Sequence, residues 1–321
     1  MKIENLLKEK NGVKFLQQRS LQKIVAVALF FVVGFYFISF YVDFSFKKPV
    51  SRYEFLNPAR NFWHTEDLII NFQPLRDFLN QYEKNPNISI YFEFLNTGSN
   101  ISVHQDAQFY PASLLKVPVA IAVAKKIERN DWRWDNKLVI MAGDKDDKFG
   151  NMYKEQTGST WTIEELVRRS LVDSDNTAHF ILVRNLELAE IEDVYDHMGL
   201  KNFLLTRGDL SAKRYSVILR TLYNASYLSE GNSQKILQLL SLSEFKEYVQ
   251  SGLPDNVLFV HKIGVSKEQN VFLDSGIVYA PNRPYVLTVI VKTADESEAK
   301  DIMKTVSAQI YKYVSEYQKE L

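Results

Sequence analysis

One uncharged segment near the N-terminus restricts the possible folds more than any other feature of the sequence. Residues 24–42, IVAVALFFVVGFYFISFYV, form a run of 19 residues without a charged side chain. About 20 apolar residues in a helix cross the ~30 Å hydrocarbon core of a bilayer. A water-soluble helix of this length would carry a polar stripe, and this run has none. We therefore expect a single transmembrane helix here rather than a buried helix of a soluble domain.

The residues on either side of this segment indicate its orientation and the layout of the chain. The preceding tail, residues 1–23, carries six basic and two acidic residues, and a basic flank favours the cytoplasmic side. No small-x-small cleavage site follows the apolar run, so we expect an uncleaved anchor rather than a signal peptide. The sequence thus predicts a cytoplasmic tail, a single-pass anchor over 24–42, a connector over 43–60 and an extracytoplasmic domain over 61–321 in the cell envelope.

The hydrophobic pattern of the remaining chain is typical of an α+β domain. Helical spacing brackets the domain at 65–85, where Pro74 interrupts it, and at 296–318. Residues 113–250 have a mostly helical pattern. Segments rich in β-branched and aromatic residues predict strands at 88–96, 101–110, 257–265, 270–280 and 284–292. We expect an antiparallel sheet of about five strands, terminal helices on one of its faces, and an inserted all-helical subdomain.

Composition excludes several classes of site. Cysteine is absent, which excludes disulfides, thiol catalysis and cysteine-ligated metals. The five histidines lack metal-ligand spacing, and no phosphate-binding glycine loop is present. Without the N-terminal tail the chain has more acidic than basic residues, and it has no basic patch for nucleic acid. We therefore expect no metal, no cofactor and no nucleic-acid partner.

A serine and a lysine three residues apart, Ser113 and Lys116, begin the apolar helical part of QFYPASLLKVPVAIAV. Ser-x-x-Lys occurs five times, and only this copy follows a strand and opens an apolar helix. Residues three apart share a helix face, so the lysine amine can reach the serine hydroxyl. Burial and the helix N-terminus both favour a neutral lysine, which can activate a serine as a base. On this motif alone, the simpler interpretation is a capping serine beside a lysine that reaches water.

Two later motifs favour the catalytic interpretation. The only Ser-Asp-Asn of the chain begins at Ser174, between two helical stretches. A Lys-Ile-Gly begins at Lys262, inside the first strand of the C-terminal meander. Ser-x-x-Lys, Ser-Asp-Asn and Lys-Thr-Gly, in this order, are the motifs of class A β-lactamases and penicillin-binding proteins. With these motifs, the domain resembles the class A β-lactamase-like family of penicillin-recognising serine hydrolases.

This resemblance implies a role for each matching residue. Ser113 would be the nucleophile, Lys116 its proton partner and Ser174 the residue that passes a proton to the leaving nitrogen. Lys262 would attract a substrate carboxylate. The implied substrate-binding residues are Asn176, Gly264 and Val265. The backbone N–H groups of the last of these and of the nucleophile would form an oxyanion hole. The implied substrate is a β-lactam or a peptidoglycan-type peptide.

The sequence departs from the family pattern at two places. Ile263 replaces the threonine of Lys-Thr-Gly, which removes a hydroxyl that helps to hold a β-lactam carboxylate. Class A β-lactamases carry a glutamate that activates the deacylating water in a loop after Ser-Asp-Asn. The corresponding segment here, 199–211, contains no glutamate, and its only acid is Asp209, which has a shorter reach. We therefore expect an acyl-enzyme that forms and persists.

Three functions remain open on this evidence. The first is a membrane-anchored, extracytoplasmic serine hydrolase that is acylated by β-lactams or peptidoglycan-type amides and deacylates weakly. The second is a true β-lactamase that uses an unidentified deacylation base. The third is a non-catalytic module that binds the cell wall with a retained pocket. The intact serine and lysine motifs favour retained acylation, whereas Ile263 and the missing glutamate disfavour efficient β-lactam turnover.

Overall fold

The computed structural model of the protein describes four stretches of the chain: residues 29–36, 53–57, 67–201 and 209–318. The chain divides into two compact units, Met1–Arg52 and Tyr53–Leu321. In the first unit the described residues are helical. Within the described stretches, no helix combines the length and the apolar character that crossing a bilayer requires. The anchor predicted over 24–42 lies for the most part outside the described residues and stays a prediction.

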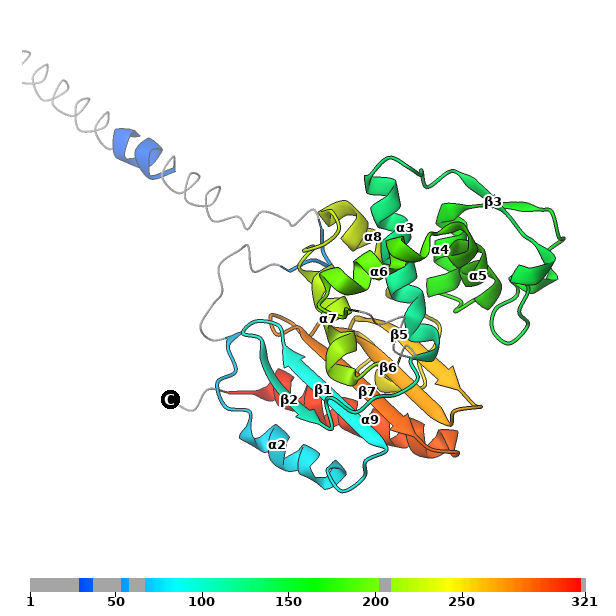
Figure 1. The fold of residues 1–321 in the computed structure, drawn as a ribbon. Helices are drawn as coiled ribbons and strands as arrows, with labels where there is room; N and C mark the ends of the chain where they lie inside the picture. The colour runs from blue at the N-terminus through cyan, green and yellow to red at the C-terminus, as the bar shows by residue number, and fades with distance from the viewer. Residues whose placement is uncertain (1–28, 37–52, 58–66, 202–208, 319–321) are drawn as a thin grey trace, which may run out of the picture. The chain divides into compact units, whose positions relative to one another are not determined.

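A five-stranded antiparallel sheet forms the centre of the second unit (Figure 1). Its strands, in spatial order, are β2 Ser99–Val103, β1 Ile88–Phe94, β7 Tyr285–Lys292, β6 Val271–Val278 and β5 Phe259–Ser266. The first and last parts of the domain meet in this sheet, because β1 pairs with β7. Every residue of β1 and of β6 is buried, as expected where both faces of a sheet are covered. The five predicted strands and their antiparallel arrangement are confirmed, although β2 begins earlier and ends earlier than 101–110.

The two terminal helices cover one face of the sheet, as predicted (Figure 1). They are α2 Gln73–Leu79 and α9 Glu296–Glu316. A stripe of α9 side chains at three- and four-residue spacing is fully buried against the strands, and it comprises Ala299, Met303, Val306, Ile310 and Val314. This apolar stripe explains why the C-terminal helix could be placed from sequence alone.

The N-terminal helix differs from its prediction. Residues 68–72, inside the predicted 65–85 helix, are not helical, and α2 begins only at Gln73. Pro74 lies in the first turn of α2. A proline there loses no helical hydrogen bond and has a φ suited to a helix start. Pro74 therefore begins the helix instead of interrupting it.

A helical block between β2 and β5 covers the other face of the sheet (Figure 1). Its helices are α3 Lys116–Glu128, α4 Ile163–Leu171, α5 Asn176–Asn185, α6 Leu188–His197, α7 Ala212–Tyr223 and α8 Glu230–Leu240. The prediction of an all-helical subdomain is wrong in one respect. Two strands, β3 Lys137–Val139 and β4 Thr160–Thr162, form a small antiparallel sheet within the block. Strands of three residues are too short to show an alternating pattern in sequence.

Residues 53–57, inside the connector predicted over 43–60, pack on the folded unit. Phe55 is buried, its ring lies edge-on to Tyr279, and its N–H donates to Gln234 Oε1 at 2.9 Å. The Asn57 N–H donates to the carbonyl oxygen of Tyr223 at 2.8 Å. The folded unit therefore includes residues that precede residue 61.

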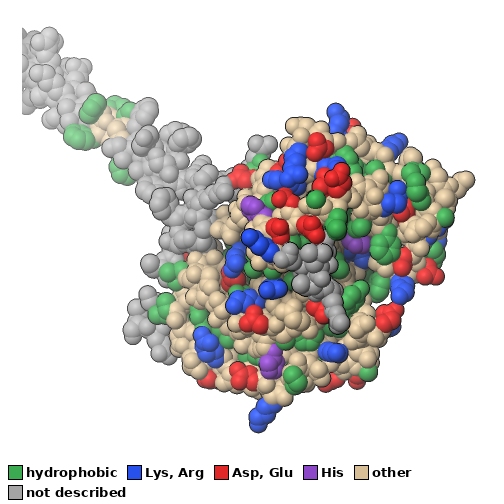
Figure 2. All heavy atoms as spheres, viewed as in Figure 1, with side chains coloured by type: hydrophobic (Ala, Val, Ile, Leu, Met, Phe, Trp, Pro, Cys, Tyr) green, Lys and Arg blue, Asp and Glu red, His purple; other side chains and the backbone are tan. Residues whose placement is uncertain are grey.

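The face of the second unit seen in Figure 2 carries acidic and basic side chains interspersed with one another. Ion pairs also join elements of this unit, such as Lys126 with Glu190 at 2.6 Å and Arg129 with Asp193 at 3.3 Å. Mixed charges of this kind produce no extended field of one sign on the face in view.

Candidate active site

Ser113 lies in a short 3₁₀ helix, Ala112–Leu115, that leads directly into α3. Ala112 has a φ of +46°, a left-handed conformation that residues other than glycine rarely adopt. Just before this turn, Phe109 pairs with Leu210 in an isolated antiparallel bridge. Backbone strain of this type costs about 1–3 kcal/mol and is concentrated at functional sites. The strained residue therefore marks the turn that presents the serine.

The amine of Lys116 connects three side chains of the predicted motifs. Its Nζ donates to Ser113 Oγ at 2.7 Å and to Asn176 Oδ1 at 2.6 Å. It also lies 3.5 Å from Ser174 Oγ. Since Ser174 and Asn176 are far from Lys116 in sequence, the fold itself assembles this cluster of four predicted site residues.

The environment of Lys116 makes it a usable base near neutral pH. Burial lowers the pKa of its amine to about 7, although the negative charges of Asp175 and Asp146 act in the opposite direction. At pH 7, roughly half of the molecules would then carry a neutral amine. A neutral amine 2.7 Å from a hydroxyl can take its proton as the oxygen attacks a carbonyl carbon.

The turn that carries Ser174 and Asn176 is fixed by the residue between them. Asp175 is buried and accepts hydrogen bonds from the N–H groups of Ala178, Asn151 and Met152. A Cβ at Gly150 would lie 2.1 Å from Asp175 Oδ2, so this crossing point accepts only glycine. Ser174 has a φ of +55°, a second left-handed residue in the site. Through these bonds Asp175 holds the backbone that positions Ser174 and Asn176.

Strand β5, at the edge of the sheet, forms the opposite wall. A Cβ at Gly264 would lie 2.9 Å from the Pro111 carbonyl oxygen, so a glycine is needed for β5 to approach the serine turn this closely. Lys262 is 1% exposed, and within the described part of the chain its amine has no hydrogen-bond partner. Burial and the charge of Lys116 lower the pKa of Lys262 far below its usual value. An amine held in this state gains strongly from an anionic partner.

These elements enclose a pocket of about 270 Å³. Of the predicted site residues, Ser113, Lys116, Asn176 and Val265 line it. The lining residues that the motifs did not indicate are Tyr110, Ala112, Asp146, Lys148, Phe149, His179, Phe180, Ser266 and Glu268. The loop 141–151 supplies three of these, and its acidic composition has no motif spacing that would have identified them. Lys148 of this loop pairs with Glu268, after β5, at 2.8 Å, so the two walls of the pocket are joined at its mouth.

His179 adds a neutral side chain to the wall of the pocket. Burial, together with the charges of Lys116 and Lys262, lowers the pKa of its imidazole to about 3. Its Nδ1 is buried without a hydrogen-bond partner among the described residues. His179 is therefore uncharged at neutral pH and adds no positive charge beside Lys116 and Lys262.

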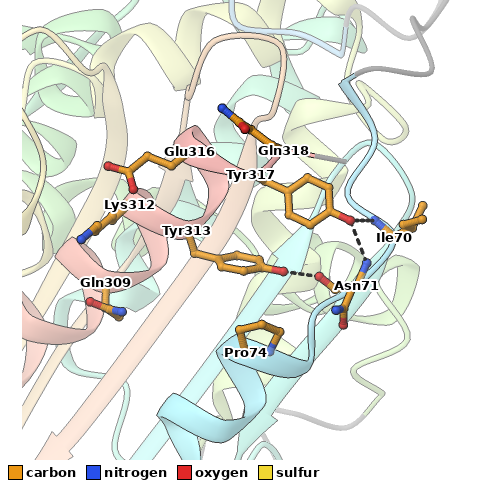
Figure 3. Close-up of a pocket in the computed structure, with 9 residues that line it drawn as sticks. All are labelled: Ile70, Asn71, Pro74, Gln309, Lys312, Tyr313, Glu316, Tyr317 and Gln318. Atoms are coloured by element: carbon orange, nitrogen blue, oxygen red, sulfur yellow. Dashed lines mark hydrogen bonds between the residues drawn. The ribbon is translucent and has the colours of Figure 1, made fainter. Parts of the chain in front are cut away.

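A larger hollow, of about 520 Å³, lies between α2 and α9, away from Ser113 (Figure 3). Tyr313 of α9 and Tyr317, just after the last residue of α9, point into it, and their hydroxyl groups bond to the backbone of Ile70 and Asn71. These bonds tie the segment before α2 to the C-terminal helix. None of the residues labelled in Figure 3 is a serine, so this hollow contains no counterpart of the Ser113–Lys116 pair. We therefore place the candidate active site at the smaller pocket.

Known proteins are similar to this chain in sequence and in fold. The sequence model of a family described as "Beta-lactamase enzyme family" matches residues 72–314. Beta-lactamase VEB-1 of Pseudomonas aeruginosa is 23% identical over 264 residues, which cover 73% of this chain and 86% of that protein. The solved structure of PBP-A has a TM-score of 0.70 at 21% identity and covers 77% of this chain and 97% of its own. A PBP-A variant solved as an acyl-enzyme complex with penicillin G has a TM-score of 0.69 at 20% identity and covers 77% of this chain and 98% of its own. At this low identity, the structural matches show a shared fold.

Proposed function

Because the chain belongs to the β-lactamase enzyme family and is therefore a serine hydrolase that acts on amide bonds, we propose that Ser113 is its nucleophile. The substrates proposed are β-lactams and peptidoglycan-type peptides, which acylate this serine. The observation that carries the proposal is the 2.7 Å bond from Lys116 Nζ to Ser113 Oγ, made by an amine whose pKa burial lowers to about 7.

In the proposed acylation, neutral Lys116 takes the proton of Ser113 Oγ as this oxygen attacks the amide carbon. The backbone N–H groups of Ser113 and Val265 stabilise the oxyanion. Ser174, 3.5 Å from Lys116 Nζ, passes the proton to the departing nitrogen as the C–N bond breaks. Lys262 attracts an anionic group of the substrate. The products of this step are an ester at Ser113 and an amine, which leaves when the substrate is a peptide and stays tethered to the ester when the substrate is a β-lactam.

Deacylation is proposed to be the slow half of the reaction. The segment 199–211 contains no glutamate that could activate water on the ester. Residues 202–208 of this segment lie outside the described residues, so the support here comes from composition. Loss of a general base slows a step by about 10²- to 10⁴-fold.

Mixing the protein with penicillin G and following its intact mass tests the proposed acylation. We expect the mass to rise by one penicillin molecule, because the opened ring stays attached to Ser113. The adduct should last minutes or longer, since no positioned base activates water. A protein mass that never changes while the penicillin also stays intact would contradict the proposed acylation, and it would leave a binding module as the better description of the domain.

Efficient β-lactam hydrolysis is the second candidate function. It is favoured by the relative VEB-1, which is named a β-lactamase and matches most of the chain. It would require another base near the ester, and Asp209 is the only acid in the 199–211 segment. Rapid consumption of penicillin without a lasting adduct would support this candidate.

The domain is proposed to act outside the cytoplasm, held by a membrane anchor over 24–42. The support is the uncharged 19-residue run and the basic tail before it. A periplasm-type reporter, active only outside the cytoplasm, is expected to be active when fused after Leu321. A cytoplasm-specific reporter at the same position should be inactive. The reverse pattern would contradict the orientation and exclude a cell-wall substrate.

A further inference from the structure

Asp146, in the loop 141–151, is linked to the catalytic pair through a chain of hydrogen bonds. Its Oδ1 accepts from Asn176 Nδ2 at 2.8 Å, and Asn176 Oδ1 accepts from Lys116 Nζ at 2.6 Å. The loop is docked at this point by Thr177, whose hydroxyl accepts from the Asp146 N–H at 3.0 Å and donates to its carbonyl at 3.2 Å. The Lys148 N–H also donates to Asp146 Oδ1, at 3.0 Å. The carboxylate is therefore held in place by backbone contacts.

We propose that Asp146 is a positioning residue for the acylation step, which fixes the Asn176 amide with its oxygen toward Lys116 and stabilises the ammonium form of that lysine. This inference rests on the proposed function, in which Lys116 is the base. Asp146 would thus determine both the geometry around the base and the pH at which the base becomes available.

The orientation follows from the chemistry of the two ends of an amide. A carboxylate can only accept hydrogen bonds, so Asp146 selects the NH₂ end of Asn176. The amide oxygen is then left to accept from Lys116. Without the carboxylate, nothing in these contacts prevents the amide from turning its NH₂ end toward the lysine, where two donors would face each other. The 2.6 Å bond that holds the amine beside Ser113 would then be lost.

The charge of Asp146 is one of several charges that act on Lys116. Among the described residues, the negative charges of Asp146 and Asp175 act on this amine, and its own charge acts on His179 and Lys262. Tyr110, Lys148 and Glu268 line the same pocket. The carboxylate of Asp175 already accepts three backbone N–H bonds, His179 is neutral, and burial together with the charge of Lys116 lowers the pKa of Lys262 far below its usual value. Burial lowers the pKa of Lys116, and Asp146 opposes this effect. Removal of the Asp146 charge should therefore make Lys116 lose its proton at lower pH.

Two variants separate the orienting contact of Asp146 with Asn176 from the effect of its charge on Lys116. Asp146→Asn keeps an oxygen that can accept from Asn176 but removes the charge. Asp146→Ala removes both the acceptor and the charge. The matched control is Asp147→Asn, which removes the same charge one residue further along, at an exposed side chain. A melting temperature for each variant establishes that it is folded.

The protonation of Lys116 is followed in the unreacted protein by the NMR shift of its ¹³Cε, assigned by its absence in Lys116→Met. The rate of acylation by penicillin G is then measured across the same pH range. In Asp146→Asn we expect both midpoints to fall by about 0.5–1 pH unit relative to Asp147→Asn, with a smaller loss of maximal rate than in Asp146→Ala. In Asp146→Ala we expect the same fall in the midpoints and a maximal rate about 10-fold lower, as for a lost charge-assisted hydrogen bond.

Equal midpoints in Asp146→Asn and Asp147→Asn would overturn the role of the charge. An unchanged maximal rate in Asp146→Ala would overturn the role in orienting Asn176. If the unmodified protein is not acylated at all, the proposed function fails, while the NMR titration still decides whether Asp146 controls the protonation of Lys116.

Discussion

Ser113→Ala is expected to abolish covalent labelling by penicillin G. The substitution removes the oxygen that Lys116 Nζ contacts at 2.7 Å, and with it the atom that would form the ester. Ser174 cannot replace it on geometric grounds, because its hydroxyl lies farther from the amine, at 3.5 Å, on a separate turn. The intact mass of the variant should stay unchanged after an incubation that labels the original protein fully. Its melting temperature should show that the fold is retained.

Ser297→Ala is the matched control for this result. Ser297 and Lys300 form another Ser-x-x-Lys of the chain, and Ser297 is exposed in the first turn of α9. Labelling of this variant should equal that of the original protein, because the spacing alone does not create a site. If Ser113→Ala still gains the mass of penicillin, the nucleophile lies elsewhere and the match to the family motif has no catalytic meaning.

Lys116→Met is expected to slow acylation by about 10²- to 10⁴-fold, as for the loss of a general base. Methionine fills similar space in a buried position, so the fold should be kept. In the original protein the acylation rate should rise with pH up to about 7 and then level off. The rate rises with pH because, below its pKa, Lys116 carries a proton and cannot accept another. In Lys116→Met this dependence on pH should disappear. Rates of acylation by penicillin G between pH 5 and 9 provide the measurement.

Lys125→Met controls for removal of a lysine from the same helix. The Lys125 amine donates to the Tyr227 carbonyl at 2.8 Å and pairs with Glu128, and it does not line the Ser113 pocket. Its acylation rate and pH profile should match those of the original protein. A Lys116→Met variant that keeps the rise toward pH 7 would show that another group supplies the base.

The parts of the fold that could be predicted are those with a strong periodic pattern. β5, β6 and β7 are rich in β-branched and aromatic residues, and α9 has its apolar residues at helical spacing. The start of α2 could not be placed, because Leu68 and Phe72 continue its spacing although the chain there is not helical. The β3–β4 pair was missed because three-residue strands carry no alternation.

The residues of the candidate site also divide into those that a sequence motif predicts and those that it does not. Motif spacing placed Ser113, Lys116, Ser174 and Asn176, and the fold brings their side chains together. Asp146 could not be found in this way, because its contact with Asn176 depends on how a loop without a motif folds over α5. The following set of side chains was missed for a similar reason, since they enter the pocket from separate elements: Lys148, Phe149, His179 and Glu268.

The departure at Ile263 has a structural reason. The side chain is 3% exposed and belongs to the apolar cluster that the sheet shares with α9. Ile263 also lines a hollow beside the Ser113 pocket, and both are lined by Lys148, Phe149, Val265 and Glu268. An apolar residue is therefore compatible with the core at this position, and the buried amine of Lys262 remains the candidate contact for a substrate carboxylate.

Fast acylation of Ser113 and slow deacylation can be separated by a burst experiment with a chromogenic cephalosporin. The product released within the first turnover is compared with the steady rate that follows. We expect a burst close to one equivalent per protein, followed by a steady phase about 10²- to 10⁴-fold slower, because the 199–211 segment contains no glutamate to activate water on the ester. Fast linear hydrolysis without a burst would contradict this expectation, and would show that a residue such as Asp209 activates the water.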